Sequence, residues 1–176
     1  RQSVDRVLEP AVRQKAAAIR ERYNELRLDA GGGLAAVFRA YDEGVAYRLE
    51  TSLAAPQVTV FGEEAVFGFI SDYTVYYPQE ESFFSHNERK YAPQKLSAIG
   101  PKAMATLPAV VEAGGVKVAI AESDVEDYPG LWLRGTNGPG LEAVFPPYPL
   151  KEALQRDRDF RVAEPAGYIA RTRGTR

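Results

Sequence analysis

The chain has 176 residues, of which 45% are hydrophobic and 26% are charged, and these values are typical of one folded globular domain. Its 22 basic and 24 acidic residues give a net charge of −2 without forming a basic stripe, so the electrostatic footprint of a nucleic-acid binder is missing. The absence of cysteine excludes disulfides and cysteine nucleophiles, and no apolar run approaches the about 20 residues that a membrane helix needs.

The first predicted element lies at residues 9–22, where good helix formers follow a proline and favour either one short helix or a loop. Beyond it the hydrophobic period changes to two. Leu34–Tyr41 and Val45–Glu50 are predicted to form a half-buried hairpin around Asp42-Glu43-Gly44, because Val, Tyr and Leu alternate with Ala, Arg and Glu in the second strand. A second hairpin is predicted from Val58–Val60 and Ala65–Phe69.

Further short strands with turn residues between them follow along the chain. They are predicted at Thr74–Tyr77, Leu107–Val111, Val116–Glu122, Leu131–Leu133, Leu141–Phe145 and Tyr168–Thr172. This spacing is typical of an all-β antiparallel sandwich with at most short helices. Two stretches, 78–108 and 146–165, lack the alternation and are predicted to be irregular functional loops or docking surfaces.

The sequence carries no self-contained catalytic motif. It has no phosphate-binding glycine loop, no nucleophile elbow and no paired-histidine metal motif. Its single histidine, His86, cannot build a histidine-rich zinc site. We therefore assign no catalytic residue.

Glu122 is the first candidate site residue. Val116, Val118, Ile120 and Glu122 share one face of their predicted strand, which is apolar until this last position. A carboxylate there reaches the rim of the sheet or needs a buried partner. The plain alternative is that the strand ends and Glu122 is solvated.

The segment Glu80–Arg89 is the second candidate, since it mixes charged and amide groups with aromatic rings in a non-strand region. Such a mixture suits sugars, whose hydroxyls accept and donate hydrogen bonds and whose apolar faces stack on rings. The alternative is a loop whose polar residues bond their own backbone. We interpret Trp132, a lone tryptophan in a strand, as a packing residue.

Four segments in order resemble the N-terminal domain of glycoside hydrolase family 97. They are Tyr23–Leu26, Phe38–Arg48, Glu81–Glu88 and Ala119–Leu133. The ending, Tyr168–Arg176, looks like the stretch just before that family's catalytic barrel. The resemblance implies that 1–176 is a single domain, a large β-sandwich (supersandwich) of galactose-mutarotase-like shape, and that a catalytic (β/α)₈ barrel absent here would follow it. It also implies an exo-acting bacterial α-glucosidase or α-galactosidase, periplasmic or secreted and dependent on calcium.

The same resemblance implies roles for particular residues. Glu122 matches the glutamate that the domain lends to the calcium site, with Asp124 as the next candidate, and His86, Asn87 and Glu88 are predicted to bind substrate. The catalytic carboxylates belong to the barrel, so we expect this chain alone to be inactive and to hold no calcium. Its expected partners are the barrel of the same chain and an α-linked oligosaccharide, with no nucleic acid and no membrane.

Two alternatives remain open from the sequence. A stand-alone carbohydrate-binding module would present a row of exposed aromatic side chains on a sheet face. An aldose-epimerase-like enzyme on the same type of sandwich is disfavoured, because one histidine leaves little general-acid machinery.

Overall fold

The computed structural model describes residues 1–13, 15–123, 125–156 and 159–172, and the chain divides into two units, Arg1–Val58 and Thr59–Thr172. The described residues form 17 strands and one turn of 3₁₀ helix at Leu96–Ala98, with no α-helix among them. The registered strand pairs are antiparallel, so the all-β prediction is confirmed. No helix in the described part of the chain is long and apolar enough to cross a membrane.

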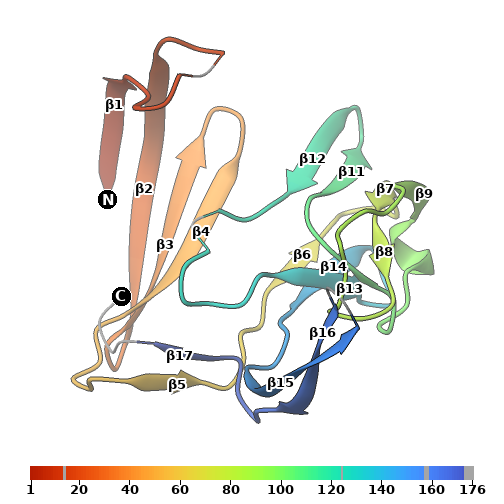
Figure 1. The fold of residues 1–176 in the computed structure, drawn as a ribbon. Helices are drawn as coiled ribbons and strands as arrows, with labels where there is room; N and C mark the ends of the chain where they lie inside the picture. The colour runs from red at the N-terminus through yellow and green to blue at the C-terminus, as the bar shows by residue number, and fades with distance from the viewer. Residues whose placement is uncertain (14, 124, 157–158, 173–176) are drawn as a thin grey trace. The chain divides into compact units, whose positions relative to one another are not determined.

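The first unit contains one four-stranded sheet in chain order, β1-β2-β3-β4 (Figure 1). Its strands are β1 (Gln2–Leu8), β2 (Ile19–Gly31), β3 (Leu34–Tyr41) and β4 (Val45–Thr51). The predicted hairpin is confirmed as β3 and β4, with Phe38 opposite Tyr47. The helix alternative for residues 9–22 is wrong at its C-terminal end, because Ile19–Arg22 pair with β1 and this pairing overrides local helix propensity.

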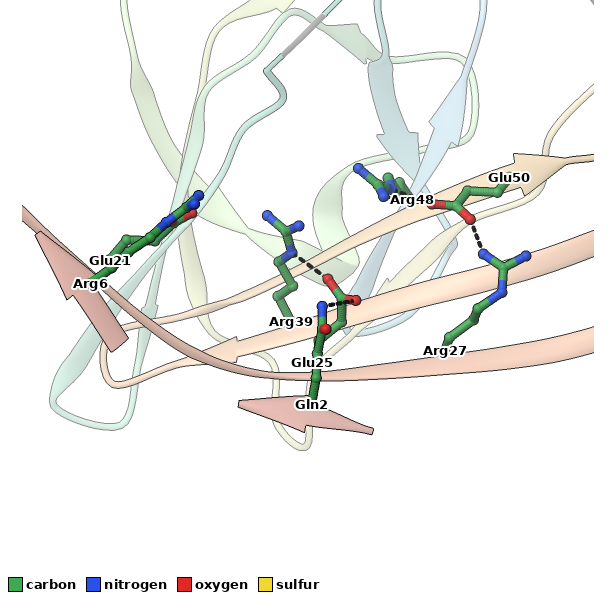
Figure 2. A network of polar contacts seen from close by, with 8 residues as sticks. All are labelled: Gln2, Arg6, Glu21, Glu25, Arg27, Arg39, Arg48 and Glu50. Carbon is green, nitrogen blue, oxygen red and sulfur yellow. Dashed lines mark hydrogen bonds and ion pairs between the residues drawn. The ribbon is translucent and has the colours of Figure 1, made fainter. Parts of the chain in front are cut away.

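One face of this sheet carries a network of arginine and glutamate side chains (Figure 2). The ion pairs cross the strands as Arg6–Glu21, Arg39–Glu25 (2.8 Å) and Arg27–Glu50, and Arg48 also reaches Glu50 at 2.6 Å. Arg27 and Arg48 flank Val37 in register, and Val37 is only 3% exposed. The Arg39 guanidinium lies 4.3 Å from the centre of the Tyr23 ring, which is also buried. The aliphatic parts of these arginine side chains therefore help to cover Val37 and Tyr23, the buried apolar residues of this face.

The opposite face of the same sheet holds the alternating apolar residues of β4. Val45, Tyr47 and Leu49 are 76%, 39% and 57% exposed. The prediction that this hairpin is half-buried through these residues is therefore wrong. A period of two groups side chains on a face, but it does not say which face is covered.

The second unit packs two sheets against one core. The first sheet runs β6-β14-β13-β10-β8 and the second β12-β11-β7-β9. Their bounds are β6 (Val66–Gly68), β7 (Thr74–Tyr77), β8 (Gln79–Glu80), β9 (Ala92–Lys95), β10 (Met104–Ala105), β11 (Ala109–Ala113), β12 (Val116–Ile120), β13 (Trp132–Gly135) and β14 (Gly140–Val144). The core draws on both sheets, with Leu133 and Leu141 from the first and Val75, Tyr77 and Val111 from the second. This is the predicted sandwich arrangement within one unit.

Several local predictions are corrected by the pairing. β5 (Val58–Val60) pairs with β17 (Ala170–Thr172), whereas β6 pairs with β14, so the second predicted hairpin does not exist. The stretch 78–108 contains β8, β9, β10 and the 3₁₀ turn, and 146–165 contains the hairpin of β15 (Pro149–Arg156) and β16 (Asp159–Pro165). β8 and β10 have only two residues each and the pairing of β15 with β16 is bulged, so these four strands show no regular alternation.

Candidate functional site

Glu122 lies just beyond β12, which ends at Ile120 rather than at Glu122 as predicted. Its carboxylate accepts the backbone N–H of Leu131, with distances of 2.8 Å to Oε1 and 3.0 Å to Oε2. Leu131 directly precedes β13. The strand therefore ends before Glu122 and the residue is exposed, as the plain alternative expects, but its carboxylate is also bound by the backbone of another segment.

The electrostatic environment of Glu122 is unfavourable to its charge. Although the residue as a whole is exposed, partial burial raises the pKa of its carboxyl above 4.5, the Leu131 N–H opposes this shift, and the nearby charge of Glu63 adds to it. Glu63 in turn accepts a hydrogen bond from the Tyr128 hydroxyl at 3.0 Å. A Cβ at Gly130 would lie 3.3 Å from Glu122 Oε1, so glycine leaves room for the carboxylate.

The carboxylates of Glu63 and Glu122 are the kind of ligand that a hard cation prefers, but two carboxylates are too few to fill its coordination shell. A cation beside Glu63 and Glu122 would offset both their mutual repulsion and the desolvation. Calcium takes about six to eight oxygens, and the described residues contain no group of three or more His, Cys, Asp or Glu suited to a metal. Further oxygens would have to come from outside this set. Asp124, the next candidate, lies outside the described residues.

The second candidate segment is a loop that leaves β8 at Glu80. The Glu80 side chain is 1% exposed; its Oε2 accepts from Arg89 Nε at 2.8 Å, and its Oε1 accepts from the Ser85 hydroxyl. Ser85 Oγ also accepts the N–H of Asn87 at 2.9 Å. The polar groups of the segment thus bond one another, as the plain loop interpretation expects, but they do so around one buried carboxylate.

The predicted substrate residues lie on the outer part of this loop. His86, Asn87 and Glu88 are consecutive and exposed, and Asn87 has a left-handed φ of 58°. Asparagine tolerates that conformation better than most residues. The loop base is fixed by Phe83, whose ring meets Trp132 edge-on with centroids 5.2 Å apart. Trp132 therefore packs, as the sequence suggested.

Both candidate segments are tied to the beginning of β13. Leu131 holds Glu122 through its N–H, and the neighbouring Trp132 holds Phe83 through its ring. Sequence reasoning missed the roles of Glu63, Tyr128 and Glu80. The residues of the Glu63–Tyr128 hydrogen bond are 65 positions apart, so no local sequence pattern could predict it. Glu80 could have been noticed, because it is an acidic residue at the start of an aromatic segment that ends in an arginine.

Comparison with known proteins gives consistent results. A family model described as the N-terminal domain of glycosyl-hydrolase 97 matches residues 1–165. A retaining alpha-galactosidase of Bacteroides thetaiotaomicron is 36% identical over 185 residues, covering 97% of this chain and 28% of that protein. A glycoside hydrolase family 97 enzyme from Pseudoalteromonas sp. strain K8, solved with acarbose, has a TM-score of 0.76 at 17% identity and covers 98% of this chain and 25% of its own. A variant from the same strain, solved with panose, matches equally well. The chain thus spans about a quarter of the length of these relatives.

Proposed function

This chain belongs to glycosyl-hydrolase family 97, of which it is an N-terminal domain, and from this premise we propose that it is the non-catalytic domain of an exo-acting α-glycoside hydrolase. In this role it packs on a catalytic barrel of the same protein and completes the calcium and substrate site from one side. The observation that carries the proposal is the Glu122 carboxylate, held by Leu131 beside Glu63 in a setting that favours a cation. A periplasmic or secreted location is part of the same proposal.

The proposed substrate is an α-linked galactoside or glucoside. The relative named retaining alpha-galactosidase favours an α-galactoside. The acarbose and panose bound in the solved relatives support an α-glucoside as the second candidate substrate. Hydrolysis needs two carboxyl groups flanking the scissile bond, and we place both in the barrel. Rates of hydrolysis of p-nitrophenyl α-galactoside and α-glucoside by the full-length protein distinguish the two substrates.

Glu122 is the proposed calcium ligand from this domain. Bound there, the ion would supply positive charge beside the substrate site. In the full-length enzyme Glu122→Gln keeps the Leu131 hydrogen bond but removes the charge, so calcium affinity measured by titration calorimetry should fall at least about tenfold. Activity should fall at limiting calcium and recover in part when calcium is added.

The matched control is Glu112→Gln, which also neutralises a carboxylate at a strand of this unit, where Glu112 pairs with Lys117 at 3.4 Å. This control should leave calcium affinity unchanged. If Glu122→Gln binds calcium as tightly as wild type, Glu122 is the wrong residue and Asp124 is tested next.

His86, Asn87 and Glu88 are the proposed sugar contacts. Their side chains are exposed on a loop whose base is fixed, so they are available to a ligand at low entropic cost. In the full-length enzyme, alanine at each position should raise KM. The unfolding temperature should be unchanged for the His86 and Glu88 variants and slightly lower for Asn87→Ala, because alanine tolerates the left-handed φ of 58° less well. Unchanged kinetics for all three variants would return the segment to a purely structural loop.

A further inference from the structure

The loop of residues 85–89 is organised by a single buried carboxylate. The two partners of Glu80 are Ser85 and Arg89, the residues directly before and after the exposed segment His86-Asn87-Glu88. One carboxylate therefore closes both ends of that segment. The segment itself contributes no bond to the closure apart from the Asn87 N–H, which donates to Ser85 Oγ.

We propose that Glu80 is a positioning residue for the sugar-binding segment His86–Glu88, acting through Ser85 and Arg89 and touching no substrate itself. This inference rests on the proposed function, because it takes the segment to be the part that meets the sugar. Glu80 is a poor candidate for contact with a ligand, since its side chain is 1% exposed.

The chain of hydrogen bonds explains how the position is transmitted. Glu80 Oε1 accepts a hydrogen bond from the Ser85 hydroxyl, which fixes the direction of that hydroxyl and leaves its lone pairs facing the Asn87 N–H at 2.9 Å. That bond supports the left-handed φ of 58° at Asn87. Glutamine at position 80 has one acceptor oxygen in place of two, so the charged Arg89 competes with Ser85 for it. Once the Ser85 hydroxyl can rotate, nothing among these bonds selects the strained backbone over an ordinary one.

The energetics point to a role in conformation rather than in stability. Removing a carboxylate from water has a large cost in free energy, as expected for a buried ion. An ion pair whose partner is half-exposed offsets only a small part of that cost. Arg89 is 49% exposed on its side chain while Glu80 is buried. The asymmetry also makes Glu80→Gln less disruptive than a change of Arg89, because the arginine left behind stays in contact with water. Changing Arg89 instead would leave the buried charge without its partner.

The test uses the full-length enzyme with p-nitrophenyl α-galactoside. Glu80→Gln and Ser85→Ala should each raise KM by about tenfold, as the loss of an oriented hydrogen bond to substrate would, with kcat within about twofold. If Glu80 and Ser85 only stabilise the fold, the variants should instead lower kcat and leave KM unchanged, because a smaller fraction of the enzyme is folded. Glu142→Gln is the control, since it removes another arginine pair of the same sheet (Arg134–Glu142, 2.6 Å), on β14, which β13 and β10 separate from the strand of Glu80.

A double variant separates this inference from the proposed function. If Glu80 acts through the segment, Glu80→Gln adds less than about twofold to KM in an Asn87→Ala background. An Asn87→Ala effect combined with wild-type KM for both Glu80→Gln and Ser85→Ala overturns the positioning role and leaves the sugar contact intact. Wild-type KM for all alanine variants at 86–88 overturns the sugar contact itself. Ser85→Ala loses only a hydroxyl, so it gives an answer even if Glu80→Gln does not fold.

Discussion

The Glu122 carboxylate and the Leu131 N–H form a hydrogen bond that both carboxylate oxygens share, at 2.8 and 3.0 Å. One donor satisfies only part of what an ionised carboxylate can accept. Burial and Glu63 therefore prevail over the bond, and the pKa of Glu122 is raised. The ionised Glu122 carboxylate therefore does not add to the stability of this domain by itself.

Glu122→Gln should therefore stabilise the isolated, metal-free chain at neutral pH. A raised carboxyl pKa means that the folded state binds the proton more tightly than the unfolded state. Wild-type stability then falls as pH rises from the ordinary value of 4.5 through the raised pKa. The amide never ionises and still accepts the Leu131 bond. Because the group is largely exposed, the gain in Tm at pH 7 should be at most about 3 °C.

Thermal unfolding of both proteins between pH 4 and pH 8 checks this sign. The two melting curves should converge on the acid side and separate toward neutrality, with the variant higher. A variant that is less stable at pH 7 would mean that the Leu131 bond outweighs the desolvation.

Tyr77→Phe should destabilise the domain by about 1–2 kcal/mol, because it removes a buried hydroxyl whose proton two backbone carbonyls share. The Tyr77 ring is fully buried, and its hydroxyl lies 2.8 Å from the Ala103 carbonyl and 2.9 Å from that of Leu133. Burial raises the pKa of this phenol, so the hydroxyl keeps its proton as a donor. Urea unfolding measures the change. Tyr76→Phe is the neighbouring control, since the Tyr76 hydroxyl makes only a 3.3 Å contact with Glu112, and its effect should be below about 0.5 kcal/mol.

The sequence predicted strands well where alternation and turn residues agreed. The hairpin around Asp42-Glu43-Gly44 is found, and the strands predicted on either side of Gly114-Gly115 pair with each other, because each pair is fixed by a local turn. The strands at Gln79–Glu80 and Met104–Ala105 were missed. Two residues show no period, and these strands exist because they pair with each other and Met104–Ala105 also pairs with β13.

The candidate site was predicted less completely for the same physical reason. Glu122 stood out because a carboxylate follows an apolar strand, and His86–Glu88 stood out by composition and resemblance. Their supports could not be read, since Leu131 and Glu63 reach Glu122 only through tertiary structure. Burial of Glu80 was equally invisible, because sequence favours exposure for any glutamate.

Gly135→Ala should destabilise the domain by about 3 kcal/mol or more, since there is no space for a methyl group. A Cβ at this position would lie 1.7 Å from the Ile99 carbonyl oxygen, a backbone atom that cannot move aside. The control is Gly68→Ala, where a Cβ would meet nothing within 4 Å. The Tm of the Gly135 variant should fall by about 6 °C or more while that of the control changes by about 1 °C. Equal Tm values for the two would show that the β13 backbone shifts freely.

The isolated chain should fold but should not hydrolyse α-galactosides or α-glucosides. In the proposed function the acid and its partner carboxylate belong to the barrel, and this domain would supply only a ligand carboxylate and loop contacts. Glu63 and Glu122 are a neighbouring carboxyl pair, and a pair is what glycoside hydrolysis needs, so they are the groups to exclude. Purified chain incubated with p-nitrophenyl α-galactoside, with and without calcium, should release nitrophenol at the uncatalysed rate. Turnover by the chain that persists through purification and is abolished in Glu122→Gln would assign the catalysis to this pair and contradict the scaffold role.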